Sequence, residues 1–99
     1  MSYKVRYTKA AKDDLKRLFA FLVERDLKAA QQARKAIGSS IELLQQFPFT
    51  CRKAVPENAF LREMVISFVA AGYVALFEIE NNVTITILAI RHQREDDFH

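Results

Sequence analysis

A chain of 99 residues, 51% of them hydrophobic and only two each Gly and Pro, is expected to fold as one domain around one core, which excludes a disordered or fibrous protein. No apolar run approaches the ~20 residues of a membrane span, and Met1 to Lys9 lacks the apolar core of a signal peptide, so we expect a cytoplasmic protein. Lys and Arg exceed Asp and Glu by 15 to 12, a net charge of +3, which is compatible with an acidic partner but does not identify one.

The N-terminal half of the chain predicts one strand and two helices. Residues 2–8 alternate between apolar and polar positions, the period of a half-buried strand. Thr8 is a candidate N-cap for a helix that runs to about Glu24, with leucines at helical spacing. Asp26 is the candidate N-cap of a second helix, which Pro48 must end. The short connection between the helices predicts an antiparallel hairpin.

The C-terminal half predicts a loop and three strands. Residues 50–59 show no apolar periodicity and are expected to form a loop. The expected strands are rich in Val, Ile, Phe and Thr and span residues 60–69, 72–79 and 83–90. Their connections are too short for a crossover, which predicts an antiparallel meander. The predicted fold class is α+β with the order βααβββ, in one domain that ends in a polar tail at residues 91–99.

Three features of this C-terminal half carry a resemblance. They are Arg62 at the start of a strand, the Gly-Tyr-Val-x-Leu-Phe strand that begins at Gly72, and the Ile-x-Ile-Leu-Ala-Ile-Arg-His sequence that ends at His92. Together with the element order, they resemble the ParE/RelE superfamily of toxins from type II toxin-antitoxin systems, and the ParE-like members in particular. The resemblance spans nearly the whole chain, and it implies a helix hairpin packed on one face of an antiparallel sheet.

The resemblance also implies a partner and a target. The partner is a cognate antitoxin, which would form a hetero-oligomer with the toxin. The target is DNA gyrase for ParE-like members, whereas RelE-like members enter the ribosome and cut messenger RNA. An inactive toxin that only binds its antitoxin is a third hypothesis. Many RNA-cutting relatives place a tyrosine near the C-terminus, where this chain has Phe98, which cannot exchange a proton. We therefore favour the non-enzymatic gyrase hypothesis.

Cationic side chains are the candidate target-binding residues. Arg62 begins an otherwise apolar strand face, and it is expected either to form an ion pair with Glu63 or Glu78 or to contact a phosphate or partner. The full candidate set comprises Arg52, Lys53, Arg62, Arg91, His92 and Arg94. For Arg94 the alternative is a solvated strand end, balanced by the acidic residues that follow it. If the protein were a ribonuclease, the catalytic residues would be Arg62, Arg91 and His92, with His92 as the acid or base.

Two further groups of residues are candidate binding sites. Phe19 and Val23 lie at i and i+4 beside the main apolar stripe of the first helix, so they either widen the core or line a groove for an antitoxin helix. His92, His99, Asp96 and Asp97 lack a fixed ligand spacing, and the single cysteine, Cys51, has no Cys or His neighbour at such spacing. The sequence therefore predicts no metal site and no other cofactor.

Overall fold

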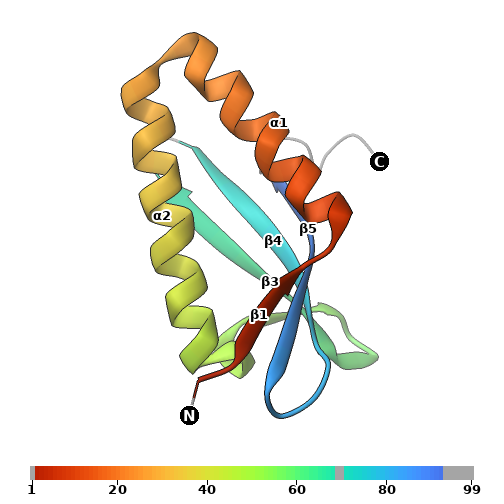
Figure 1. Ribbon diagram of the computed structural model, residues 1–99. Coiled ribbons are helices and arrows are strands. Elements are labelled where there is room, and N and C mark those ends of the chain that lie inside the picture. The colour runs from red at the N-terminus through yellow and green to blue at the C-terminus, as the bar shows by residue number, and fades with distance from the viewer. Residues whose placement is uncertain (1, 69–70, 93–99) are drawn as a thin grey trace.

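The computed structural model describes residues 2–68 and 71–92. Two helices, α1 (Lys9–Arg25) and α2 (Leu27–Gln46), form a hairpin on one face of a five-stranded sheet, and a short 3-10 helix, η1 (Pro48–Thr50), follows α2 (Figure 1). The strands in chain order are β1 (Lys4–Tyr7), β2 (Arg52–Val55), β3 (Asn58–Phe68), β4 (Ala71–Ile79) and β5 (Thr84–His92). The expected α+β class and the helix hairpin are confirmed.

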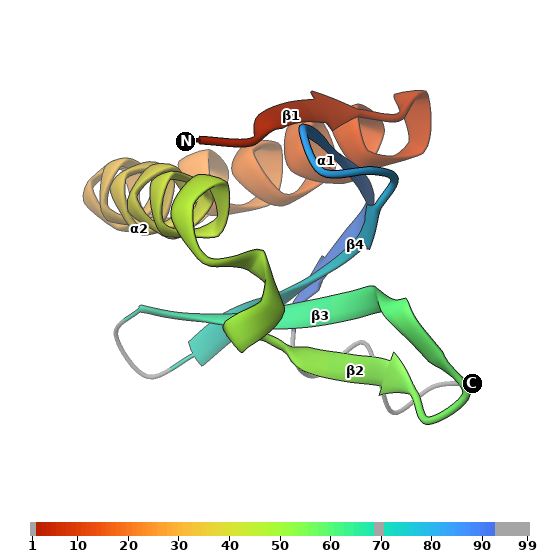
Figure 2. The ribbon, with the colours of Figure 1, turned by 90° about the horizontal axis from the view of Figure 1, so that it is seen from below.

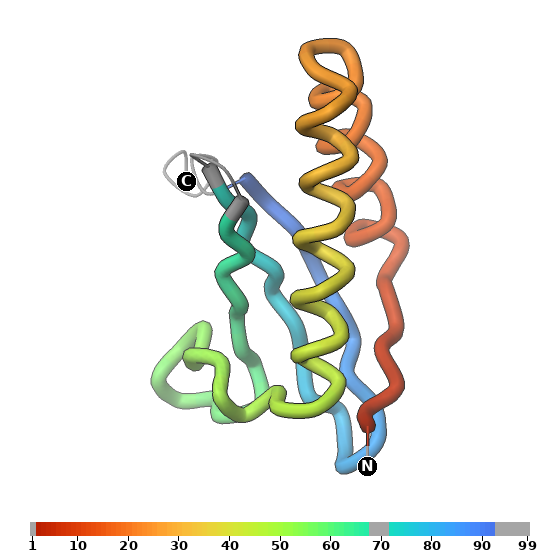
Figure 3. The backbone as a smooth tube through the Cα atoms, turned by 90° about the vertical axis from the view of Figure 1, so that its left-hand side faces the viewer, coloured from red at the N-terminus to blue at the C-terminus, as the bar shows by residue number. Residues whose placement is uncertain are grey.

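Both predicted helix caps are present. The Thr8 side chain accepts a hydrogen bond from the Ala11 amide at 3.1 Å, and the Asp26 carboxylate accepts from the amides of Lys28 and Ala29. Each bond satisfies a first-turn amide that has no partner within the helix. Asp26 is also the last residue before α2, so α1 and α2 follow one another with a single residue between them and turn back sharply (Figure 3).

The sheet is mixed, not antiparallel as expected. Its strand order is β1-β5-β4-β3-β2, and β1 pairs with β5 in parallel, whereas the other neighbours are antiparallel. The helix hairpin explains this arrangement, because α2 returns the chain to the level where β1 begins, and the Tyr3 amide donates to the Gln45 carbonyl at 2.8 Å. The first strand can therefore add to the free edge of β5 while running in the same direction. The antiparallel meander of β3, β4 and β5 is confirmed.

The expected loop over residues 50–59 is wrong. This segment begins at the last residue of η1 and contains the four-residue strand β2 and the two-residue turn Pro56–Glu57, after which β3 begins at Asn58. Strand β2 is one of the two edge strands of the sheet, and Arg52 and Lys53 on it are exposed. A short strand at a solvated edge buries no apolar face, so its sequence shows no alternation that could reveal it. Figure 2 shows β2 and β3 farthest from the helices in the strongly twisted sheet.

A bulge in β5 decides which side chains face the helices. The pairing shifts between Leu76, opposite Ala89, and Phe77, opposite Ile87, so Leu88 has no counterpart on β4. The carbonyls of Ile87 and Leu88 both accept a hydrogen bond from the Thr8 hydroxyl at the start of α1. An extra residue exchanges the two faces of a strand beyond it. After the bulge, Ile90 and His92 are consequently opposite the core residues Ala75 and Tyr73, and Arg91 is opposite Val74.

The core lies between the hairpin and the sheet. The helices contribute Ala11, Leu18, Ala33, Ile37 and Leu44, and the strands contribute Met64, Ile66, Tyr73, Ala75, Phe77, Ile79, Ile85, Ile87 and Ile90. Four residues of α2 at helical spacing are buried, namely Ala30, Ala33, Ile37 and Leu44, and Ile41 packs against the core from a partly exposed position. Burial of Met64 and Ile66 also confirms the apolar strand face that Arg62 begins.

Candidate functional site

Arg62 lies on β3 and binds backbone carbonyls. Its Nε donates to the Ala59 carbonyl at 2.7 Å, and its Nη1 donates to the carbonyls of Phe49 at 3.0 Å and Cys51 at 2.7 Å. The guanidinium also lies over the Phe49 ring, 5.2 Å from its centroid. The expected ion pair with Glu63 or Glu78 is therefore wrong. Arg62 instead links β3 to η1 and to the start of β2. Its partners are neutral carbonyls, so they do not compensate the positive charge of the guanidinium.

The other two cations of this region lie on β2. Arg52 is opposite Glu63 in the register, and its Nε contacts the Glu63 carboxylate at 2.8 Å. Lys53 is directly opposite Arg62 and is exposed. Within residues 2–68 and 71–92, neither Lys53 nor Arg62 has a carboxylate partner. Opposed residues on antiparallel strands have Cβ atoms roughly 5 Å apart, so Lys53 and Arg62 form an uncompensated pair of positive charges.

At the end of β5, Arg91 is bound by a residue that the sequence reasoning missed. Asp14 of α1 is 8% exposed, and its Oδ1 accepts a hydrogen bond from Arg91 Nη1 at 3.1 Å. Its Oδ2 accepts from the Ile90 amide at 2.9 Å, and Arg17 lies 3.7 Å from Oδ1. Asp14 shares the buried stripe of α1 with Ala11 and Leu18. A carboxylate at a core position of a helix was the available signal, since such a group requires cationic or amide partners.

His92 is the last described residue of β5. Its ring packs edge-to-face on Tyr73, with 5.7 Å between the centroids, and Tyr73 is almost fully buried. An aromatic contact of this kind fixes the orientation of the imidazole against the core. Arg94, the remaining candidate, lies outside the described residues, as do the tail residues Asp96, Asp97, Phe98 and His99.

The register separates the residues that a ribonuclease would need. His92 is opposite Tyr73, which is opposite Ile66, four positions along β3 from Arg62. Four positions correspond to about 13 Å along the strands, and two strand spacings add about 10 Å across them. Arg91 alternates with His92 along β5, and its guanidinium is occupied by Asp14 of α1. Arg62, Arg91 and His92 are therefore not gathered around one point where a phosphate could react.

Phe19 and Val23 line a groove along the helix hairpin. The groove has a volume of about 520 Å³, and its other lining residues are Leu27, Ala30, Gln31 and Arg34. Val23 and Leu27 expose 51% and 59% of their surface, whereas Phe19 is partly buried against the core. The structure thus brings the two candidate antitoxin-binding residues together in one hollow, which we call the hairpin groove.

Two ionisable groups near the core have shifted acidities. Burial raises the pKa of the Cys51 thiol, and the nearby positive charge of Arg62 partly opposes that change. Burial alone raises the pKa of the Tyr7 hydroxyl. Over the described ranges, no group of three or more His, Cys, Asp or Glu residues is placed to hold a metal ion. No helix among those described is both long and apolar enough for a bilayer crossing.

These features define a class of protein: a small basic α+β domain in which a helix hairpin covers a mixed sheet whose outer strand carries cations. The family model described as "ParE toxin of type II toxin-antitoxin system, parDE" matches residues 5–97. The chain therefore belongs to the ParE toxin family of type II toxin-antitoxin systems.

A solved structure supports the fold. The "Chromosomal ParDE TA system from P. aeruginosa" aligns with a TM-score of 0.68 and 21% sequence identity, over 92% of this chain and 96% of that chain. At this identity the likeness concerns the fold alone. No curated protein matches the sequence.

Proposed function

We propose that this toxin acts without catalysis, by binding DNA gyrase and stabilising the complex of gyrase with cleaved DNA. Membership of the ParE family is the observation that carries the proposal. The separation of Arg62 from His92 along and across the strands supports a binding role over ribonuclease chemistry, which needs an acid, a base and cations around one phosphate.

The β2 edge is the proposed contact with the target. Lys53 is exposed opposite Arg62, and the three carbonyl bonds of Arg62 fix its position without neutralising its charge. A fixed guanidinium and a mobile ammonium side by side suit an anionic group of the gyrase-DNA complex, either phosphate or carboxylate. Arg52 is bound to the Glu63 carboxylate, so it would contact the target only after breaking that ion pair.

The hairpin groove is the proposed binding site of the antitoxin. Val23 and Leu27 offer an apolar floor, and Arg34 offers one charge at its rim. An amphipathic helix with an acidic residue beside its apolar stripe would fit such a groove. Val23→Asp should therefore weaken antitoxin binding by about tenfold or more, because it places a carboxylate against the apolar face of that helix.

Phe21→Asp is the matched control for that variant. Phe21 is as exposed as Val23, at 52%, but it does not line the groove and lies against Arg25 instead. Titration calorimetry of each variant with the antitoxin encoded beside the toxin gene measures the effect. Equal losses for both variants would contradict the assignment of the groove.

The test of the target follows DNA and protein synthesis after induction of the toxin in growing cells. Labelled thymidine incorporation should fall first and an SOS reporter should rise, because trapped cleaved DNA triggers both. Early loss of labelled methionine incorporation with intact DNA would instead favour the ribosome-dependent ribonuclease. A chain that binds antitoxin but affects neither process would be an inactive toxin.

A charge reversal on the β2 edge tests whether this edge contacts the target. Lys53→Glu should abolish most of the fall in DNA synthesis, since it neutralises the charge pair with Arg62. Lys4→Glu is the control, because Lys4 is an exposed cation on the opposite edge of the same sheet. Equal toxicity of Lys53→Glu and the unmodified protein would remove the β2 edge from the proposed interface.

A further inference from the structure

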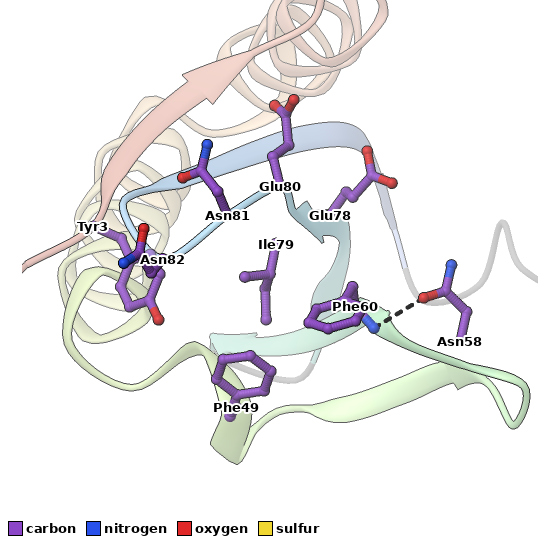
Figure 4. A pocket seen from close by; sticks show the side chains of 9 residues that line it. All are labelled: Tyr3, Phe49, Asn58, Phe60, Glu78, Ile79, Glu80, Asn81 and Asn82. Carbon is purple, nitrogen blue, oxygen red and sulfur yellow. Dashed lines mark hydrogen bonds between the residues drawn. The ribbon is translucent and has the colours of Figure 1, made fainter.

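A second hollow lies at the foot of the sheet, beyond the end of α2. It has a volume of about 690 Å³, is open to solvent, and is lined by side chains from η1, the start of β3 and the connection between β4 and β5 (Figure 4). A hollow of this size falls within the range that receives an organic group as large as a nucleotide. We call it the foot groove.

Two exposed phenyl rings form one side of the foot groove. Phe49 of η1 and Phe60 of β3 are 49% and 54% exposed, and their rings meet edge-to-face with 6.2 Å between the centroids. The Asn58 side chain accepts a hydrogen bond from the Phe60 amide at 2.9 Å, which fixes the backbone that carries this ring (Figure 4). Two rings in contact, each with about half of its surface in water, form an apolar patch of the kind that receives a partner.

Two cations lie next to the rings. Arg62 follows Phe60 by two positions on β3, so the two side chains leave the same face of the strand. Lys53 is directly opposite Arg62 on β2 and is exposed. The Arg62 guanidinium lies over the Phe49 ring, and its Nε and Nη1 are bound to carbonyls, whereas Nη2 forms no hydrogen bond within the described ranges. The rings are therefore beside a fixed cation with an unused N–H donor group and beside an exposed ammonium.

The acidic residues that border the foot groove point elsewhere. Glu78 and Glu80 alternate with the buried Ile79, so their side chains leave the opposite face of the sheet. Glu80 also accepts a hydrogen bond from the Thr86 hydroxyl. Figure 4 shows both carboxylates directed away from the two phenyl rings. The charge beside the rings is consequently positive.

From this combination we infer that the foot groove binds single-stranded DNA, with an unpaired base stacked on Phe49 or Phe60 and the neighbouring phosphate bound by Arg62 and Lys53. Every base offers a flat π-face to an aromatic ring, and rings beside cations form a site that accepts single strands of any sequence. The inference deepens the proposed function and rests on it for the choice of DNA, because the same two cations are the proposed contact with the gyrase-DNA complex.

The test measures binding of fluorescently labelled oligonucleotides to the purified toxin by anisotropy. A thymidine octamer should bind about fivefold more tightly, or better, than an abasic octamer with the same phosphates, because only the first can stack. Equal affinities would overturn the inference, since phosphate contacts alone would then account for binding.

Two competitors test the class of occupant. An RNA octamer of the same bases should not bind more tightly than the DNA octamer, and tighter binding of the RNA would exclude DNA as the occupant. The acidic peptide acetyl-Gly-Asp-Phe-Asp-Gly-amide should displace the octamer poorly. If it displaces the octamer at a lower concentration than unlabelled octamer does, the foot groove is a protein-binding site and the inference is wrong.

Toxin variants assign the binding to the foot groove. Phe60→Ser should weaken binding of the thymidine octamer by about fivefold and leave the abasic octamer unaffected, whereas Lys53→Ala should weaken both by about threefold. Phe21→Ser is the matched control, because Phe21 is 52% exposed and lies under the Arg25 guanidinium, but on α1. If Phe21→Ser loses as much affinity as Phe60→Ser, or if Lys53→Ala loses none, the inference is wrong.

Circular dichroism measures whether each variant is folded. Phe60→Leu keeps the apolar bulk of the side chain and removes its aromatic face, so it repeats the test if the serine variant unfolds. Gyrase is absent from these measurements, so the two claims can fail separately. A toxin that yields linear plasmid with gyrase but binds the thymidine and abasic octamers equally would keep the proposed function and contradict the inference. A toxin that binds the thymidine octamer through Phe60 but yields no linear plasmid would contradict the proposed function alone.

Discussion

At the β2 edge of the sheet the Arg62 guanidinium donates to three backbone carbonyls, whereas at the end of β5 the Arg91 guanidinium faces the Asp14 carboxylate. Neutral carbonyls fix a cation and leave its charge available. A carboxylate fixes a cation and compensates its charge. Two arginines that look equivalent in the sequence, each near a strand end, therefore have different capacities to attract an anionic partner.

Arg62 and Arg91 also have different structural roles. Arg62, on β3, connects its own strand to η1 and to Cys51, the residue before β2. Near the end of β5, Asp14 and not Arg91 has the corresponding structural role. Its second carboxylate oxygen accepts from the Ile90 amide and so attaches α1 to β5 beyond the end of β1. The Arg62 guanidinium thus holds its region of the fold together, whereas near Arg91 the Asp14 carboxylate does so.

The largest effect is expected from Asp14→Ala. The variant leaves the Ile90 amide without an acceptor in a buried position, and we expect a loss of about 2–3 kcal/mol in the free energy of unfolding. The lost ion pair contributes little of this, since the Arg91 side chain is 43% exposed. Urea unfolding measures the change. Asp13→Ala, at the exposed neighbouring position, should differ from the unmodified protein by less than about 0.5 kcal/mol.

Arg62→Ala should cost less, about 1–2 kcal/mol, because the carbonyls it leaves are partly solvated and can bind water. Arg62→Lys should recover only a part of that loss, since one ammonium group cannot reproduce the forked contacts of the guanidinium. Urea unfolding of the Arg62→Ala and Arg62→Lys variants measures both losses. Full recovery by lysine would mean that charge alone, and not the three bonds, secures η1 to β3.

The exposed ion pair on β2 is expected to matter still less. The Arg52 side chain is 60% exposed and contacts Glu63 across the two strands. Removing such a pair changes stability by roughly 0–1 kcal/mol. A double-mutant cycle with Arg52→Ala and Glu63→Ala measures the coupling. A coupling as large as the Arg62→Ala effect would show that the β2 edge is fastened by salt bridges and not by carbonyl bonds.

The smallest effect concerns alkaline pH. Burial raises the pKa of the Cys51 thiol in the fold above its ordinary value of 9.0, so the fold favours the neutral thiol. The stability linked to this group is complete below pH 9.0 and is lost as the pH rises through the higher folded pKa. Cys51→Ala should therefore lose less stability than the unmodified protein above pH 9.0, in urea unfolding under reducing conditions. Parallel pH profiles would contradict the assignment to Cys51, although Tyr7 adds a similar change above 10.0 in both proteins.

Features with strong local signals were predictable from the sequence. Thr8 and Asp26 are caps by residue type and position, and the apolar spacing of α2 and the β-rich run after Ala59 fix the helix hairpin and the meander. The parallel pairing of β1 with β5 was not predictable, because Tyr3, Val5 and Tyr7 show which face is buried but not which strand lies beside them. Strand β2 was not predicted because a short strand at a solvated edge shows no alternation of apolar and polar residues.

The candidate site was predicted less well for the same reason. Residue type indicated that Arg62 and Arg91 need partners, but their partners come from positions 11 and 13 residues away and 77 residues away in the chain. The bulge at Leu88, whose carbonyl accepts from Thr8, sets the register that puts His92 and not Arg91 opposite the core residue Tyr73, and no local sequence pattern marks it. In contrast, Phe19 and Val23 share a helix face by spacing, and the structure places both in the hairpin groove.

The most direct test of the proposed activity uses purified gyrase, supercoiled plasmid, ATP and the purified toxin. If the toxin stabilises the gyrase complex with cleaved DNA, linear plasmid should accumulate after detergent and protease treatment, and Lys53→Glu should reduce it strongly while Lys4→Glu should not. Intact plasmid at every toxin concentration, together with cleavage of messenger RNA on added ribosomes, would contradict the account.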